Sequence, residues 1–460
     1  MNQKLCFFLS VFTMMNCILM AQNVGIGTNQ PQTRLHVEQG TVLFKGPALF
    51  PATPGPLPVS GAGVRLLWYP GKAAFRAGVV TGSEWDADSI GNFSVAMGES
   101  SKASANGTVA MGIGTIASGY AAVSFGFSCN AAGFGSLAMG NGTIAFGSNT
   151  VSIGTSNRAM ATNAVAIGVR NLANGIESMA MGSLNTCDGS QTVALGSENA
   201  AAGNRSTAIG TDSRASGEYA IVLGNSSSAS SSYAVSIGKS VTASGANSVS
   251  LGNYVSTSGY AGAFALGDAS TTAVMQSFVA NGFRARFAGG YRLFTNSAVT
   301  IGAFLNANAN SWAALSDVRM KENFLPVDGE VILQKIAAMP QYTWNYIGQD
   351  VATLRHYGPM AQDFYQAFGR DGLGEIGCDT LINQQDFLGV SYIAIQSLEK
   401  RTTQLATENT LLKNKLLLLE EDNKKLADKL LQLSEKLEAA VRSMKEQSAN
   451  ETITSTRLVE

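Results

Sequence analysis

Apolar and small side chains alternate in short phrases that recur every 14 residues between residues 92 and 267. In the first phrase Val95 and Met97 flank Ala96, and Gly98 ends it. The period of 2 predicts a β-strand with the larger side chains on one face and the small ones on the other. The same spacing holds for twelve glycines: Gly98, Gly112, Gly126, Gly140, Gly154, Gly168, Gly182, Gly196, Gly210, Gly224, Gly238 and Gly252.

A second glycine lies halfway through most repeats, as at Gly119 and Gly133. The repeat is therefore predicted to hold two strands of about five residues, each ended by a turn that tolerates positive φ. Sequence units of fixed length stack into solenoids, and twelve coils at ~4.8 Å each make a rod about 60 Å long. The face of Ala and Ser is too shallow for an ordinary core. We expect it to approach the backbone of another chain, with a tight coil that needs small residues as the alternative.

A heptad pattern begins at Ile395 and predicts a parallel coiled coil over residues 396–446. Its a positions are Ile395, Thr402, Asn409, Leu416, Asn423, Leu430, Leu437 and Met444. Its d positions are Leu398, Leu405, Leu412, Leu419, Leu426, Leu433 and Ala440. Asn409 and Asn423 would fix the register, but the heptads alone do not decide between two and three strands. Residues 447–460 are predicted to be disordered.

The flanks of the repeats break the period. Residues 22–91 are predicted to form a small β cap over the first open coil, because an exposed strand edge needs covering. Here His36 is expected to be a strand residue. Residues 268–313 are expected to form a β connector whose arginines are paired and solvated: Arg284, Arg286 and Arg292.

Net charge, the apolar N-terminus and the cysteine content limit the possible partners and location of the protein. The formal net charge of the 460 residues is −1, which favours neither nucleic acid nor an anionic membrane. Residues 1–21 resemble a secretory signal and predict a secreted or bacterial cell-surface protein, with an uncleaved membrane anchor as the alternative. No later apolar stretch is long enough to span a bilayer. The three cysteines after the signal form no disulfide framework, and we expect no metal and no cofactor.

The repeat phrases resemble a known family. SVAMG at 94–98 and NAVAIG at 163–168, with the half-repeat ASG at 117–119, are similar to the head repeats of trimeric autotransporter adhesins. The resemblance implies a left-handed parallel β-roll in a three-chain bundle that binds host matrix or other surfaces.

The octet SDVRMKEN at 316–323 places a lysine five residues after a serine. A turn between them would bring the hydroxyl and the amine together, although this spacing alone is common. The octet is followed by YTWN at 342–345, HYGPMAQD at 356–363 and VSYIA at 390–394. Together they resemble the intramolecular chaperone domain of phage endosialidase tailspikes, the peptidase S74 family. The resemblance implies a trimeric domain at 314–395 that aligns three chains and then cuts itself away.

The same resemblance implies roles for single residues. Ser316 would be the nucleophile and Lys321 its base, Asp317 and Arg319 would orient the motif, and His356 would support the fold or the cut. The base role requires Lys321 to be desolvated. Two alternatives stay open: the domain could trimerise without cleaving, and Ser316 and Asp317 could cap a helix that begins near Val318.

These observations predict a mainly β protein: a left-handed parallel β-roll, trimeric, followed by a small α+β chaperone domain and a parallel coiled coil. We expect an exported trimeric surface fibre or adhesin whose chaperone domain drives trimerisation and cleaves itself off at Ser316. Its enzymatic part would be a single-turnover serine peptidase with no outside substrate. Its partners would be its own copies and a host or environmental surface ligand, but no nucleic acid. The alternative is a non-cleaving structural or phage-like fibre protein with a permanent C-terminal trimeriser.

Overall fold

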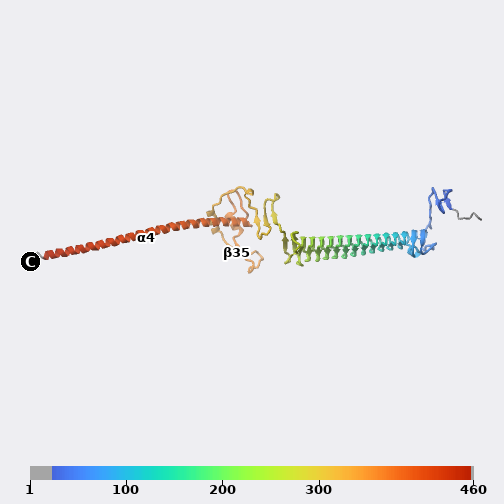
Figure 1. Ribbon diagram of the computed structural model, residues 1–460, viewed down its shortest axis with the longest axis horizontal. Coiled ribbons are helices and arrows are strands. Elements are labelled where there is room, and N and C mark those ends of the chain that lie inside the picture. Colours follow the sequence, from blue (N-terminus) through green and yellow to red (C-terminus); the bar gives the residue numbers. More distant parts are fainter. Residues whose placement is uncertain (1–22, 457–460) are drawn as a thin grey trace, which may run out of the picture. The chain divides into compact units, whose positions relative to one another are not determined.

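The computed structural model describes residues 23–456, so the predicted signal at 1–21 lies outside the described residues. The chain divides into two compact units, Met1–Leu315 and Ser316–Glu460. The first unit is a β-solenoid with additional strands at both ends. The second combines short helices, a hairpin and one long helix (Figure 1).

Each 14-residue repeat forms one coil with a five-residue strand and a two-residue strand. The long strands are β5 (Val95–Glu99), β7 (Val109–Ile113), β9 (Val123–Phe127), β11 (Leu137–Asn141), β13 (Val151–Thr155), β15 (Val165–Val169), β17 (Met179–Ser183), β19 (Val193–Ser197), β21 (Thr207–Thr211), β23 (Ile221–Asn225), β25 (Val235–Lys239), β27 (Val249–Asn253) and the four-residue β29 (Phe264–Gly267). The short strands are β6 (Lys102–Ala103), β8 (Ile116–Ala117), β10 (Asn130–Ala131), β12 (Ile144–Ala145), β14 (Arg158–Ala159), β16 (Leu172–Ala173), β18 (Thr186–Cys187), β20 (Ala200–Ala201), β22 (Arg214–Ala215), β24 (Ser228–Ala229), β26 (Thr242–Ala243), β28 (Val255–Ser256) and β30 (Met275–Gln276).

The strands of successive coils pair in parallel, so that Gly140 lies beside Gly154 and Leu137 beside Val151. The long strands belong to one sheet and the short strands to another. The prediction of two five-residue strands is wrong for the second strand. Two left-handed residues in each coil, such as Asn149 and Ser156, bend the chain and leave only two residues for that strand.

The small side chains face the inside of the coil, and the larger apolar ones face outward. Ala96, Ala138 and Ala166 are fully buried, whereas Val95 and Met97 are only partly covered. The prediction that the Ala and Ser face contacts another chain is therefore wrong, and the alternative of a tight coil is correct. Two sheets joined by such short turns lie too close together for anything larger than a few atoms per position.

The 14-residue glycines adopt the positive φ that their spacing predicted. At Gly140 φ is +124°, and a Cβ built there would lie 2.0 Å from the carbonyl oxygen of Gly154. The glycines halfway through the repeat behave differently, because the φ angles of Gly119 and Gly133 lie outside the left-handed region. The left-handed turn positions instead carry varied residues such as Arg170 and Leu184, so this part of the prediction is wrong.

Four buried asparagines form a ladder inside the solenoid: Asn157, Asn171, Asn185 and Asn199. The side-chain amide of Asn185 donates to Oδ1 of Asn171 at 3.0 Å and to the carbonyl oxygens of Met181 and Gly196, both at 2.8 Å. The ladder thus supplies donors to backbone carbonyls, including those of the 14-residue glycines, that would otherwise be buried without partners.

We expect Asn185→Ala to destabilise the solenoid by ~3 kcal/mol, because it leaves the carbonyls of Met181 and Gly196 without a donor inside the coil. Asn174→Ala is the matched control, since Asn174 is exposed and bonds only Asp188 among the described side-chain contacts. Chemical denaturation of both variants measures the difference. Equal midpoints for Asn185→Ala and the wild type would contradict a stabilising ladder.

The N-terminal end of the solenoid is closed by a hairpin of β3 (Gly63–Tyr69) and β4 (Ala74–Val80), followed by the 3-10 turn η2 (Ala87–Ser89). The turn η1 (Pro70–Lys72) joins the two strands, and β4 pairs in parallel with β5. Ahead of them β1 (Val24–Ile26) pairs with β2 (Leu35–Val37), which contains His36 as expected.

Arg76 and Trp85 fill the open end of the first coil and are both fully buried. Arg76 donates to the carbonyl oxygens of Ser94 and Ala103, each at 3.0 Å, and Trp85 donates to that of Ser101 at 2.8 Å. Burial lowers the pKa of the Arg76 guanidinium to about 10. These donors replace part of the hydrogen bonding that a preceding coil would provide. The cap therefore covers the edge of the first coil and also supplies hydrogen-bond donors to its carbonyl groups.

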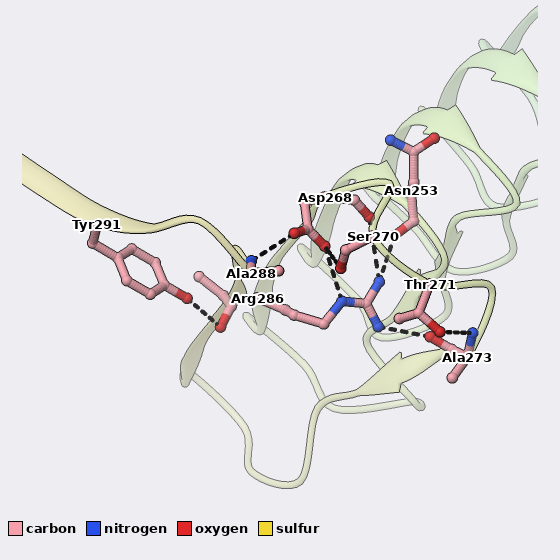
Figure 2. A network of polar contacts seen from close by, with 9 residues as sticks. Asn253, Asp268, Ser270, Thr271, Ala273, Arg286, Ala288 and Tyr291 are labelled. Atoms are coloured by element: carbon pink, nitrogen blue, oxygen red, sulfur yellow. Dashed lines mark hydrogen bonds and ion pairs between the residues drawn. The ribbon is translucent and has the colours of Figure 1, made fainter. Parts of the chain in front are cut away.

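The C-terminal end is closed around Arg286, at the end of β31 (Phe283–Arg286). Its guanidinium binds Asp268 at 3.2 Å and donates to the carbonyl oxygens of Ala273 and Asn253 (Figure 2). Arg284 and Arg292 lie over the rings of Phe278 and Phe304, respectively. The strands β32 (Gly290–Phe294), β33 (Gly302–Asn306) and β34 (Ala313–Ala314) then form a separate antiparallel sheet.

The Asp268 carboxylate gives this end a pH dependence. Hydrogen bonds from the Ala288 amide, Ser270 and Arg286 lower the pKa of Asp268 from 3.8 to about 2. A carboxylate with a lowered pKa stabilises the fold above its unfolded value of 3.8, and this stability is lost as the pH falls towards 2. We expect Asp268→Asn to melt at a lower temperature than the wild type at pH 7, with the gap closing between pH 4 and pH 2. A gap that stays constant over that range would contradict the assignment.

The second unit contains the turn η3 (Val318–Met320), α2 (Gly329–Ala338), a hairpin of β35 (Tyr342–Trp344) and β36 (His356–Gly358), α3 (Ala361–Phe368) and α4 (Gln384–Thr456). α4 includes all the heptads and begins before the predicted coiled coil. It also extends into the predicted disordered tail, which is helical to Thr456 (Figure 1). Among residues 23–456, no helix is long and apolar enough to cross a membrane.

Candidate active site

Ser316 and Lys321 meet at the first turn of the second unit. Asp317 accepts a hydrogen bond from the backbone amide of Arg319 and so begins the 3-10 turn η3. The turn ends at Lys321, whose backbone amide donates to the carbonyl oxygen of Val318 at 3.2 Å. This reversal brings Nζ of Lys321 to 2.7 Å from Oγ of Ser316. The two atoms are at the distance needed for proton transfer.

Asp317 and Arg319 form an ion pair beside this dyad. Nε of Arg319 lies 3.0 Å and 3.1 Å from the two carboxylate oxygens of Asp317. The side-chain hydrogen bond from Arg319 lowers the pKa of Asp317, and the carboxylate raises that of Arg319. The pair holds the turn that carries Lys321. Of the two residues expected to cap a helix near Val318, only Asp317 caps the turn η3. The side chain of Ser316 bonds Lys321 instead.

His356 lies elsewhere in the unit, on β36, where it stacks on Trp344 of β35 with ring centroids 4.6 Å apart. Tyr346 contacts both rings edge-on. No hydrogen bond in the described part of the chain joins His356 to Ser316 or Lys321. Nε2 of His356 and Nε1 of Trp344 are shielded from water and have no partner among residues 23–456. The structure therefore places His356 in the hairpin and not in the dyad.

Arg355 is a structural residue that the sequence did not reveal. Its guanidinium donates to Oγ1 of Thr343 at 2.7 Å and to Oδ1 of Asn345 at 3.1 Å, so it joins the two strands of the hairpin. Asn345 belongs to the YTWN motif, but nothing in the one-dimensional pattern indicated its partner.

The dyad is open to water in the single chain, since both Ser316 and Lys321 are exposed. An exposed amine is strongly hydrated, and removal of water favours its neutral form, which is the form that acts as a base. The described residues contain no group of His, Cys, Asp and Glu suited to hold a metal ion. The chemistry that this site offers is nucleophilic attack by a hydroxyl with an amine as proton acceptor.

The second unit buries few apolar side chains for its length. Within the described residues its buried apolar side chains are Pro359, Phe364, Phe368 and Ala394. The heptad leucines of α4 are about half to two-thirds exposed, from 49% at Leu398 to 68% at Leu437. A long helix with one bare apolar stripe is stable when other helices cover that stripe.

The described residues thus combine a β-solenoid with a second unit whose first turn brings a serine and a lysine together. Residues 316–373 match the family model for the chaperone of endosialidase. The model for the YadA head domain repeat matches five segments: 89–115, 131–157, 161–185, 188–213 and 215–240. The chain thus carries YadA-type head repeats ahead of an endosialidase-type chaperone domain, as its motifs indicated. No curated protein matches it.

Proposed function

We propose that the protein is an exported, homotrimeric surface fibre or adhesin that assembles through its C-terminal domain and then releases that domain by cutting before Ser316. The observation that carries the proposal is the Ser316–Lys321 contact of 2.7 Å at the first residue of the segment that matches the chaperone model. In this proposal residues 314–395 are the chaperone domain and 396–446 the coiled coil. The solenoid is the part that is displayed.

Three chains would associate through two surfaces. The first is the heptad stripe of α4. The second is the outward face of the long strands, where larger apolar side chains lie one above another in every coil, as Val109 and Met111 do above Val95 and Met97. Both surfaces are partly or fully exposed in one chain. Burying an apolar side chain of this size contributes ~1.5–3 kcal/mol, so a continuous stripe favours association strongly.

The proposed cut uses only atoms of this chain and water. Neutral Lys321 accepts the hydroxyl proton of Ser316 while Oγ bonds to the carbonyl carbon of Leu315. The C–N bond to Ser316 then breaks, its nitrogen takes up the proton from Lys321, and an ester links Leu315 to Oγ. Hydrolysis of this ester leaves a carboxylate on Leu315 and restores the hydroxyl.

Association and cleavage are linked in this proposal, because covering by neighbouring copies is what would remove water from the exposed dyad. A C-terminal domain that trimerises first would also help the three solenoids to fold side by side. It raises the local concentration of three long chains that must align in register. After the C-terminal domain has been released, the trimeric solenoid would persist because its chains separate slowly.

We expect sedimentation of the full chain to give a trimer, and the double substitution of Leu412→Asp and Leu419→Asp to give monomers with little cleavage. Charged groups at two d positions would be buried without partners. Asn414→Asp is the matched control, because position 414 is at f, opposite the seam. A monomeric wild type at micromolar concentration would overturn the proposal.

A further inference from the structure

One stretch of the solenoid has no charged side chain at all. Between Lys102 and Arg158, which are themselves separated by four coils, no Asp, Glu, Lys, Arg or His occurs. The coils that follow carry charges regularly, including Arg170, Glu177 and Asp188. The uncharged coils differ from the rest of the rod in their surface chemistry, although their backbone pairing is the same.

Aromatic rings are exposed on one corner of these coils. Tyr120 and Phe134 occupy equivalent positions in neighbouring coils and are 56% and 55% exposed. Their rings are stacked, with centroids 5.4 Å apart and planes within 5° of parallel. The equivalent positions in the coils before and after are Asn106 and Ser148. The stack is therefore two rings long, and no further ring of this column covers its outer faces.

The neighbouring short strands extend this surface. The outward residues of β8, β10 and β12 pair in register as Ile116, Asn130 and Ile144. Asn130 as a whole is half-buried, but its Oδ1 is shielded from solvent and accepts no hydrogen bond from any described residue. Phe146, two residues after Ile144, is also exposed. We call the whole surface the neutral patch, and it consists of Ile116, Tyr120, Asn130, Phe134, Ile144 and Phe146.

We propose that the neutral patch binds an uncharged polysaccharide. A pyranose ring carries C–H groups on its faces and hydroxyl groups around its edge. It is thus matched by exposed aromatic rings in a surface without charge. This inference rests on the proposed display of the solenoid as a fibre, and it names the class of ligand.

A second copy of the chain fits the patch less well. An interface that follows the rod needs an apolar column in every coil, which the long strands provide. The column of Ile116 and Ile144 is interrupted in the following coils by Arg158, Thr186 and Arg214, with Leu172 and Ala200 between them, so it is not continuously apolar. An apolar patch confined to a few coils is typical of a local binding site.

The solenoid also contains a matched control. Tyr219, which is partly buried, and the exposed Tyr233 form another stack, with centroids 4.9 Å apart. Here the guanidinium of Arg205 lies over the Tyr219 ring at 5.2 Å and donates to its hydroxyl at 2.6 Å. One outer face of this stack is thus occupied by a cation of the same chain, and Glu218 lies nearby at 3.9 Å from Arg205.

Affinity electrophoresis of the full chain tests the proposal, in native gels that contain hydroxyethylcellulose, xyloglucan, galactomannan or glycogen, with polygalacturonate as an acidic polymer. We expect retention by at least one neutral polymer. Tyr120→Ser with Phe134→Ser should weaken it at least tenfold. Tyr120→Phe with Phe134→Tyr keeps both rings and should be retained like the wild type, as should the control Tyr233→Ser.

Unchanged melting of the Tyr120→Ser and Phe134→Ser protein would show that its loss of retention is not a loss of fold. Retention by no neutral polymer, retention by the acidic polymer alone, or equal retention of wild type and double variant would each overturn the proposal. So would a change of sedimentation coefficient in the double variant, which would assign the patch to contacts between copies. Sedimentation also separates the two proposals: a trimer that binds no glycan refutes only the ligand class.

Discussion

Ser316→Ala is expected to abolish self-cleavage, leaving one full-length band on denaturing electrophoresis where the wild type gives two fragments. The substitution removes the oxygen that lies 2.7 Å from Nζ of Lys321, and no other atom of residue 316 can form the ester. Loss of the nucleophile typically lowers such a rate by ~10³-fold or more. Mass spectrometry of the wild-type fragments should place the new N-terminus at Ser316.

Lys321→Ala should have the same effect as Ser316→Ala, whereas Lys321→Arg distinguishes charge from base function. Arginine retains the positive charge but does not lose its proton at ordinary pH, so we expect it to be equally inactive. Ser311→Ala is the control, since Ser311 is a nearby exposed serine outside the motif. A fragment that begins at residue 316 in the Ser316→Ala protein would refute the dyad. A single full-length band from a trimeric wild type would favour the permanent trimeriser.

Gly140→Ala is expected to disrupt the solenoid far more than Gly142→Ala, although the two glycines are two residues apart. At Gly140 a Cβ would lie 2.0 Å from the carbonyl oxygen of Gly154, and φ is +124°. Neither the partner backbone nor the turn can move without breaking the register of the next coil. We expect a loss of more than ~4 kcal/mol, enough to unfold neighbouring coils.

At Gly142 the same methyl group has room. Its φ of +62° lies in the left-handed region, and the nearest atom to an added Cβ is Oγ of Ser156 at 3.8 Å. Ser128 and Ser156 adopt this conformation at the equivalent positions of neighbouring coils. The expected cost is ~1 kcal/mol. Thermal melting and far-UV circular dichroism compare the two proteins, and similar melting temperatures would contradict the steric argument.

The period of the repeat predicted the stacking and the backbone conformation of the 14-residue glycines, and the resemblance to adhesin head repeats implied the parallel pairing. The period did not predict which face is buried. Alternation distinguishes two faces but does not say which one is inside, and the larger residues Val95 and Met97 suggested the wrong answer. The deciding quantity is the distance between the two sheets, which depends on turns such as that at Ser100. Those left-handed turns carry ordinary residues in most coils and glycine in only a few, such as Gly142, so they leave no periodic signal in the sequence.

The caps and the ladder depend on contacts between distant residues. Arg76 reaches Ala103, 27 positions away, and each asparagine reaches the next at a distance of 14. A single arginine in a strand gives no hint that it will be buried against carbonyl groups. For the site, the motif placed Ser316 and Lys321 correctly within one turn, and the structure brings their side chains together. It keeps His356 in a separate hairpin, which the linear order of the motifs did not reveal.

Each coil bonds only to the coils next to it, and the two ends are closed by Arg76 and Arg286. A whole repeat can therefore be added or removed in the middle without altering either closure. Duplication of 42 nucleotides within the gene would lengthen the rod by one strand spacing, about 4.8 Å. The length of the solenoid is thus a property that recombination can adjust in equal steps.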